Sequence, residues 1–204
     1  MQVEDVETKE VKIIILGETG VGKTSLINRY VNNEFNNDNE VTVGSSSSEK
    51  LVKRLNVNYR LTIWDTSGQE KYHSVTNLFI KGSNIVILIY SIDSMNSFEH
   101  LKYWYSAMKD NLDKQNYILA IVGNKCDLSN EAVVSEEEGK KFAKDKKALF
   151  KLVSAKEDPN GVNKLFDILL DELGQIDFES RTDSYKITKP RKKKKEKKNN
   201  KTFC

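Results

Sequence analysis

The feature that most constrains the fold of this chain is a strand, turn and helix near the N-terminus. Val11 to Leu16 is apolar apart from Lys12, which is typical of a buried strand of a parallel sheet. The run leads into the turn Gly17-Glu18-Thr19-Gly20-Val21-Gly22-Lys23-Thr24, and residues 24–31 then fit a helix with one apolar face. This order predicts a strand–helix unit of an α/β sheet.

The turn has the spacing G-x-x-x-x-G-K-[ST], which is typical of a phosphate-binding loop when it joins a strand to a helix. Its glycines let backbone N–H groups point inward, and the helix N-terminus adds positive potential. Lys23 would meet the β- and γ-phosphates, and Thr24 would offer its hydroxyl to Mg²⁺. The loop by itself does not separate a kinase, an ATPase and a GTPase. The expected nucleotide-binding residues here are Glu18, Thr19, Gly20, Val21, Gly22, Lys23, Thr24 and Ser25.

Apolar runs and amphipathic segments alternate along the rest of the chain. The spacing predicts strands at 50–57, 59–65, 85–90, 117–122 and 149–153, helices at 94–112 and 135–145, and a last helix with Gly174 as its C-terminal cap. Asn58 is the expected turn of a hairpin, and residues 32–48 are expected to form a long loop. The expected fold is therefore α/β, with a mostly parallel six-stranded sheet, one antiparallel hairpin strand and helices on both faces.

A second polar cluster, Asp65 to Glu70, follows one of these strands. An acid at a strand end is suited to holding Mg²⁺, often through water. Gly68 has no Cβ atom, so its N–H can approach a γ-phosphate closely. Gln69 offers both a donor and an acceptor, so it can orient an attacking water. Thr42, in the long loop, is a candidate for a second hydroxyl ligand of Mg²⁺ because of its spacing from Lys23.

A third polar cluster, Asn124-Lys125-Cys126-Asp127, follows the 117–122 strand. The Asp127 carboxylate can accept from N1–H and from the N2 amino group of guanine at once, whereas adenine presents neither donor. The Lys125 stem can lie over the base plane. Ser154-Ala155-Lys156 follows the last strand, where the Ala155 N–H could reach guanine O6. Ligands bind at the carboxyl ends of strands in open α/β sheets, so these clusters predict one guanine-nucleotide site.

Taken together, the three clusters resemble the Ras superfamily of small GTPases, over about four-fifths of the chain. Several segments resemble the Rab type in particular: Thr42-Val43-Gly44, the Trp64-Asp65 step, Lys71-Tyr72-His73-Ser74-Val75, and Ser97-Phe98 with Trp104. The resemblance implies a P-loop NTPase G domain that binds GTP or GDP with Mg²⁺ and hydrolyses GTP. Its catalytic residues would be Gln69 and Lys23, its metal ligands would come from Thr24, Thr42 and Asp65, and Phe35 would pack edge-on to the base.

Other expectations follow from the resemblance and its departures. A Rab-type switch regulates vesicle trafficking through an effector, an exchange factor, a GTPase-activating protein and prenylation and extraction machinery. Rab proteins usually continue G-x-x-F after this glycine, but here Gly44 is followed by Ser45 to Ser48. This departure leaves open a non-catalytic GTP-binding scaffold with a degenerate switch I. A P-loop nucleotide kinase is a separate alternative. Asn124 to Asp127 argues against the kinase.

The charge of the chain is unevenly distributed along its 204 residues. Its 33 basic and 30 acidic residues give +3, but nine basic residues and one acid lie from Lys189 onward. That tail carries +8 and the rest carries −5. Such a tail cannot bury apolar surface and should be disordered by itself. The expected domains are a flexible N-terminus at 1–10, a G domain at 11–175 and a disordered, hypervariable polybasic tail at 176–204 that ends in Cys204.

The basic tail needs an anionic partner, and a membrane surface and a nucleic acid are the two candidates. Cys204 is the expected lipidation site, and the basic run would add attraction to an anionic membrane. A C-a-a-X box is excluded by the position of Cys204, which leaves one prenyl chain. An unmodified cysteine, a purely solvating tail and a nuclear-import or nucleic-acid patch are the alternatives. The acidic body argues against nucleic acid binding. No secretory signal is expected, and two cysteines indicate a reducing compartment, so the protein is expected to be a cytoplasmic monomer, peripheral on an endomembrane.

Overall fold

A computed structural model describes the protein over residues 8–37, 42, 44–54, 57–68, 78–112 and 117–175. Six strands form one sheet in the order β2-β3-β1-β4-β5-β6. Only the β2–β3 pair is antiparallel, and every other neighbouring pair is parallel. The expected α/β fold is thereby confirmed. The strands are β1 (Thr8–Leu16), β2 (Ser45–Arg54), β3 (Val57–Thr66), β4 (Ile85–Ser91), β5 (Ile118–Asn124) and β6 (Leu149–Leu152).

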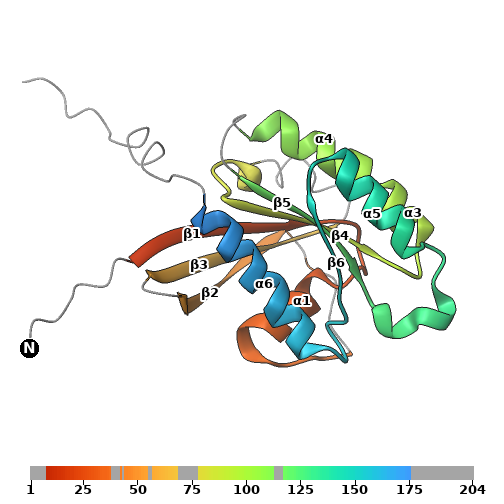
Figure 1. The fold of residues 1–204 in the computed structure, drawn as a ribbon, viewed down its shortest axis with the longest axis horizontal. Helices are drawn as coiled ribbons and strands as arrows, with labels where there is room; N and C mark the ends of the chain where they lie inside the picture. The colour runs from red at the N-terminus through yellow and green to blue at the C-terminus, as the bar shows by residue number, and fades with distance from the viewer. Residues whose placement is uncertain are drawn as a thin grey trace, which may run out of the picture.

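Helices cover both faces of the sheet (Figure 1). They are α1 (Lys23–Asn32), α3 (Met95–Glu99), α4 (Leu101–Asn111), η2 (Cys126–Glu131), α5 (Glu136–Asp145) and α6 (Pro159–Gly174). One hydrophobic core lies between the sheet and the helices α1 and α6, and the other lies between the sheet and α3, α4 and α5. The buried strand β4 divides the two cores, because its side chains alternate between them.

The first core is closed by aromatic stacking between α1 and α6. Tyr30 and Phe166 stack with their ring centroids 3.6 Å apart, and burial raises the pKa of the Tyr30 hydroxyl. The second core is centred on Trp104, which is fully buried in α4. Among the described residues, no helix is long and apolar enough to cross a bilayer.

The register of the parallel strands places their carboxyl ends at the same edge of the sheet. Leu16 is paired with Leu88, Ser91 with Asn124, and Gly123 with Leu152. The turn that follows β1 and the loops that follow β3, β5 and β6 therefore converge. This is where an open α/β sheet binds ligands.

The long loop after α1 ends earlier than predicted, because Ser45 to Ser48 belong to β2. Ser45 is paired with Thr66 and Ser48 with Ile63, so the backbone ladder, not side-chain hydrophobicity, extends this strand. Asn58 is also not the hairpin turn: it lies inside β3, paired with Lys53, and the connection passes through residues 55–56. The period-2 pattern did not reveal the start of β2, because β2 is an edge strand and begins with four polar residues.

Two helix ends differ in detail from the expectation. The segment at 94–112 is two helices, α3 and α4, which meet at His100. Gly174 is the last residue of α6 and Gln175 is the cap, so the prediction of a Gly174 cap was wrong. The Asp158 side chain caps the N-terminus of α6 by accepting from the Gly161 N–H at 2.8 Å, and Pro159 is the first residue of the helix.

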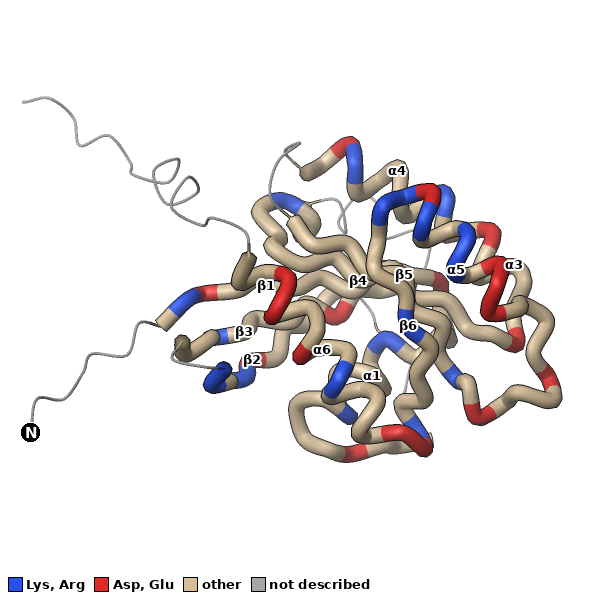
Figure 2. The backbone as a smooth tube through the Cα atoms, in the orientation of Figure 1, with Lys and Arg blue, Asp and Glu red and all other residues tan. Residues whose placement is uncertain are grey.

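Charges of both signs are interspersed on the folded part of the chain (Figure 2). In α5, three glutamates occupy the first turn and lysines follow towards the end. This order favours the helix, because acids stabilise its N-terminus and bases its C-terminus. Ser135 and Glu138 close the N-terminus as a reciprocal capping box, and these hydrogen bonds lower the pKa of Glu138.

Candidate nucleotide-binding site

The loop between β1 and α1 is arched around the ammonium of Lys23. Its Nζ donates to the carbonyl oxygens of Gly17 at 2.8 Å and Glu18 at 2.7 Å. The side chain is buried, and this desolvation lowers the pKa of Lys23 to about 8, against the opposing effect of Asp65 and Glu18. A buried cation held by backbone carbonyls at a helix N-terminus is suited to an anionic ligand.

A group of oxygen atoms lies beside this cation. Thr24 Oγ1 donates to Asp65 Oδ2 at 2.7 Å and lies 3.0 Å from Thr42 Oγ1, which is 3.3 Å from the same carboxylate oxygen. Burial raises the pKa of Asp65, while hydrogen bonds from Thr24 and the charge of Lys23 oppose that rise. The three side chains come from α1, β3 and the long loop, and the fold brings them to one point.

These oxygens fit a divalent metal of the Mg²⁺ type. The other carboxylate oxygen, Asp65 Oδ1, is buried and has no hydrogen-bond partner among the described residues, which is costly unless a cation or water satisfies it. Mg²⁺ prefers one or two carboxylates with hydroxyl, water and phosphate oxygens. Within the described ranges no three His, Cys, Asp or Glu side chains form a cluster.

Asn124 joins the phosphate loop to the loop that follows β6. Its Nδ2 donates to the Val21 carbonyl at 2.8 Å, and its Oδ1 accepts from the Ala155 N–H at 3.2 Å. The same amide lies against Gly22, whose φ of 94° favours glycine and whose position leaves no room for a Cβ atom. The two loops are therefore held together by one buried side chain.

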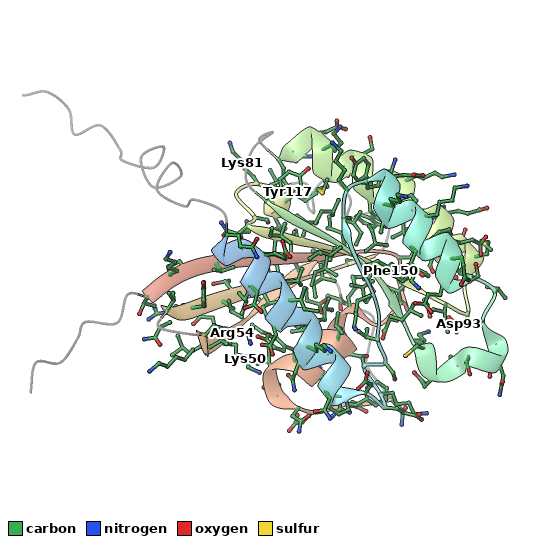
Figure 3. The ribbon with its side chains drawn as sticks, viewed as in Figure 1. Lys50, Arg54, Lys81, Asp93, Tyr117 and Phe150 are labelled. Atoms are coloured by element: carbon green, nitrogen blue, oxygen red, sulfur yellow. The ribbon has the colours of Figure 1, made fainter. Side chains whose placement is uncertain are left out.

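A second group of polar side chains lies in the loops that follow β4, β5 and β6. Ser154 Oγ donates to Asp127 Oδ1 at 2.6 Å, which leaves the other carboxylate oxygen of Asp127 for a ligand. Lys125 has a φ of 63°, and its ammonium lies 3.7 Å from Asp93 Oδ2. Asp93 lies in the loop after β4 (Figure 3). Cys126 lies between Lys125 and Asp127 in the sequence. It is a free, half-buried cysteine, and burial raises the pKa of its thiol.

Many of these groups line one pocket of about 400 Å³, a volume within the usual range of small-molecule sites. Most of the predicted site residues line it: Thr19, Gly20, Gly22, Lys23, Thr24, Ser25, Phe35, Thr42, Gly68, Asn124, Lys125, Asp127, Ala155 and Lys156. Asn36, Asn37, Thr66 and Leu128 also line it. Nothing in the spacing of these four distinguishes them from ordinary loop or strand residues.

Four predicted site residues do not line the pocket. Val21 and Ser154 are buried behind it and act through Asn124 and Asp127. Asp65 lies behind Thr24. The Glu18 side chain points to α4, where its Oε1 accepts from Trp104 Nε1 at 3.2 Å and pairs with His100 Nδ1 at 3.0 Å.

Gly68 packs directly on the backbone of Glu18 and Thr19, where a Cβ atom would not fit. The segment after β3 therefore begins in contact with the phosphate loop. The two remaining predicted site residues, Gln69 and Cys204, lie outside the described part of the chain.

A sequence model described as the Ras family matches residues 12–175. Similar curated proteins carry Rab names. Ras-related protein Rab-31 of Rattus norvegicus is 36% identical over 169 residues, which cover 83% of this chain and 86% of that protein. Ras-related protein Rab-17 of Homo sapiens is 40% identical, with coverage of 80% and 76%. Ras-related protein Rab-11B of Dictyostelium discoideum is 38% identical, with coverage of 84% and 77%. The chain belongs to the Ras family and is of the Rab type.

Membership gives the pocket its general chemistry. Binding of GTP and GDP with Mg²⁺, GTP hydrolysis and control by regulator proteins are general properties of this family. The Rab-type chain differs from the usual Rab sequence at Ser47, which is exposed and paired directly opposite Trp64. Trp64 instead stacks on Phe79, with centroids 4.7 Å apart. Trp64 therefore still has an aromatic partner, Phe79, although Ser47 stands where the usual Rab sequence has a phenylalanine.

Proposed function

We propose that this Rab-type chain is a molecular switch that binds GTP and GDP, hydrolyses GTP and acts in vesicle trafficking. The observation that carries the proposal is one pocket that both Lys23 and Asp127 line, with Asn124 bonded to the Val21 carbonyl of the phosphate loop and to the Ala155 N–H of the loop after β6. A cation for phosphates and a carboxylate for a base are thereby held at a set separation.

The base would be recognised mainly by Asp127. Ser154 orients this carboxylate, and its remaining acceptor capacity suits the two donors on one edge of guanine. Adenine would place an acceptor against the carboxylate, and such mismatches at a hydrogen-bonding site cost several orders of magnitude in affinity. The Lys125 stem, held by Asp93, and the half-buried Phe35 would enclose the base plane.

At the other end, Lys23 would bind the β- and γ-phosphates, and Thr24, Thr42 and Asp65 would hold Mg²⁺. The metal, when bound, supplies positive charge that stabilises the transferring phosphoryl group. Gln69 would orient the attacking water through its amide. Thr42 reaches Thr24 and Asp65, which supports a working switch I more than a degenerate scaffold.

The base assignment is tested by calorimetry with GDP, ADP and xanthosine diphosphate. Wild-type protein should bind GDP at least about a thousandfold more tightly than ADP. Asp127→Asn should lose affinity for GDP and gain affinity for the xanthine nucleotide, because its amide donates to the xanthine C2 oxygen. Asp145→Asn, an exposed change at the end of α5, is the control and should change neither affinity. Equal binding of GDP and ADP by the wild type would refute the proposal.

Hydrolysis is tested separately by single-turnover assays of bound GTP. Gln69→Leu should slow the reaction by at least about a hundredfold while GTP affinity is retained. Leu and Gln have similar volumes, so the change removes the amide without creating a large cavity. If Gln69→Leu hydrolyses GTP as fast as wild type, the catalytic role of Gln69 is wrong.

The trafficking role depends on the polybasic tail and on Cys204. Mass spectrometry of the C-terminal peptide from cells tests for a prenyl group on Cys204. Sedimentation with vesicles that contain anionic lipid should then show salt-sensitive binding, at about 1 kcal/mol per lysine near the surface. Cys204→Ser should abolish stable binding, and replacing Lys192 to Lys195 with Gln should weaken it. An unmodified Cys204 in the native protein would contradict the anchor.

A further inference from the structure

Arg29 connects α1 to the loop that follows β6, which is the loop expected to meet the base. Its Nε donates to the Ala155 carbonyl at 2.8 Å, and one terminal nitrogen donates to the Lys156 carbonyl at 3.1 Å. The other terminal nitrogen donates to the Asn33 carbonyl at 2.9 Å. These contacts span 126 and 127 residues of sequence, so they exist only in the folded chain.

The guanidinium donates to three backbone carbonyls and, at 3.4 Å, to the side-chain oxygen of Asn33. In the described part of the chain no carboxylate forms an ion pair with Arg29. Asn33, at the C-terminal cap of α1, has a φ of 58°, and its carbonyl closes the helix end on the same side chain. A planar guanidinium holds two neighbouring carbonyls in a set direction, which a lysine ammonium does not do.

Arg29 fixes the two carbonyls that follow the Ala155 N–H in the chain. This N–H belongs to the preceding peptide group, whose Ser154 carbonyl accepts from the Asp158 N–H at 3.0 Å. Arg29 holds the carbonyls of Ala155 and Lys156 on the α1 side of the loop. The Ala155 N–H lies on the side of Asn124, whose Oδ1 accepts it at 3.2 Å, and both residues line the pocket. This distance lies at the upper end of the usual range for an N–H···O bond, and one N–H can be shared between two acceptors.

We infer that Arg29 is a positioning residue for base specificity: it anchors the Ala155–Lys156 segment to α1, which keeps the Ala155 N–H within reach of the O6 atom of guanine, and it does not touch the ligand itself. The inference rests on the proposed guanine-nucleotide function. Lys23 and Thr24 begin the same helix, so Arg29 also sets the base loop at a constant distance from the phosphate end of the pocket. Losing Arg29 would loosen one end of the site and leave the other in place.

The experiment compares GDP with 6-thio-GDP, in which sulfur replaces O6 while both donors to Asp127 remain. Sulfur is a weak acceptor, so the analogue already lacks most of the Ala155 hydrogen bond. Arg29→Met keeps an apolar stem and removes every donor. It should weaken GDP binding by about tenfold, the value of one hydrogen bond, and weaken 6-thio-GDP binding by less than about threefold. Arg29→Lys should give an intermediate loss for GDP.

Arg54→Met is the matched control. Arg54 lies on β2, where it pairs with Asp167 and Asp171 of α6, and Figure 3 shows it beside α6. It does not line the pocket, so its loss should leave both affinities unchanged. An equal loss of both nucleotides in Arg29→Met, or no loss of either, would overturn the inference. Wild-type protein that fails to bind GDP would instead refute the proposed function. If Arg29→Met does not fold, the same comparison is made with Arg29→Lys.

Discussion

The side-chain amide of Asn124 lies against Gly22, in the place where any other residue at position 22 would carry its Cβ atom. One buried side chain thus requires a glycine in a loop 102 positions away in the sequence. The amide also bonds to Val21 and Ala155, so it cannot move aside without leaving a buried polar group unpaired. The phosphate loop and the base loop are consequently parts of one packed unit.

This packing predicts that Gly22→Ala is more destabilising than Gly20→Ala. Both glycines have positive φ, at 94° and 81°, but a Cβ atom on Gly20 would meet nothing within 4 Å. Gly20→Ala should therefore lower the free energy of unfolding by about 1 kcal/mol through backbone strain alone. Gly22→Ala should lower it by about 2–4 kcal/mol, because the amide of Asn124 must also move. Urea unfolding without nucleotide measures both, and equal losses would contradict the contact.

The oxygen cluster of Thr24, Thr42 and Asp65 predicts that Thr24→Ala weakens Mg²⁺ binding. Thr24 Oγ1 is bonded to Asp65 and lies next to Thr42, so its loss removes one ligand and disturbs the orientation of the carboxylate. The Mg²⁺ concentration that half-maximally slows release of a fluorescent GDP should rise by at least about tenfold. Thr62→Ala on β3 removes a hydroxyl outside the pocket and should leave this concentration unchanged. An unchanged midpoint in Thr24→Ala would exclude it as a ligand.

The pairing of Ser47 with Trp64 predicts that an aromatic residue at position 47 stabilises the hairpin. Residues directly opposite in an antiparallel pair share a face, and an aromatic pair adds about 0.5 kcal/mol. Ser47→Phe should therefore raise the free energy of unfolding by about that amount relative to Lys53→Phe. Lys53 lies on the same strand but opposite Asn58, which has no ring. Equal effects of the two changes would show that the pair with Trp64 contributes nothing.

The Glu18 side chain predicts a coupling between the phosphate loop and α4. Trp104→Phe keeps a buried ring but loses the indole N–H that donates to Glu18, so it should lower the free energy of unfolding by about 1–2 kcal/mol. Glu18→Ala should make that change less costly, with a coupling energy of about 1 kcal/mol in the double-mutant cycle. Additive single changes would mean that the hydrogen bond carries no net free energy. Trp64→Phe, away from Glu18, should show no such coupling.

Much of the fold could be predicted because the buried strands have apolar side chains on both faces. The apolar runs of β1 and β4 indicate strands that are covered on both faces by helices. Strands of this kind are typical of a parallel sheet, which the structure confirms. The prediction was wrong where backbone pairing decided the structure. Ser45 to Ser48 have no apolar pattern, yet they form a strand because β3 offers them a hydrogen-bonding edge.

The candidate site divides in the same way. Most of the residues that spacing along the chain singled out line the pocket, since each short cluster follows a strand and parallel strands end at one edge. It did not reveal Arg29, which belongs to no motif, nor that Glu18 turns away from the pocket towards His100 and Trp104. A residue's class and position in a motif do not specify which distant element its side chain meets.

The sequence by itself determined the α/β sheet, the order in which the clusters expected to meet phosphate, metal and base follow its strands, and the opposite charges of body and tail. The tertiary structure alone decided how those clusters are held at working distances. Asn124, Arg29 and Glu18 each bond across 86 to 126 residues of sequence. Such contacts depend on the order in which the strands are stacked in the sheet, and this order sets the distances between loops that no local pattern encodes.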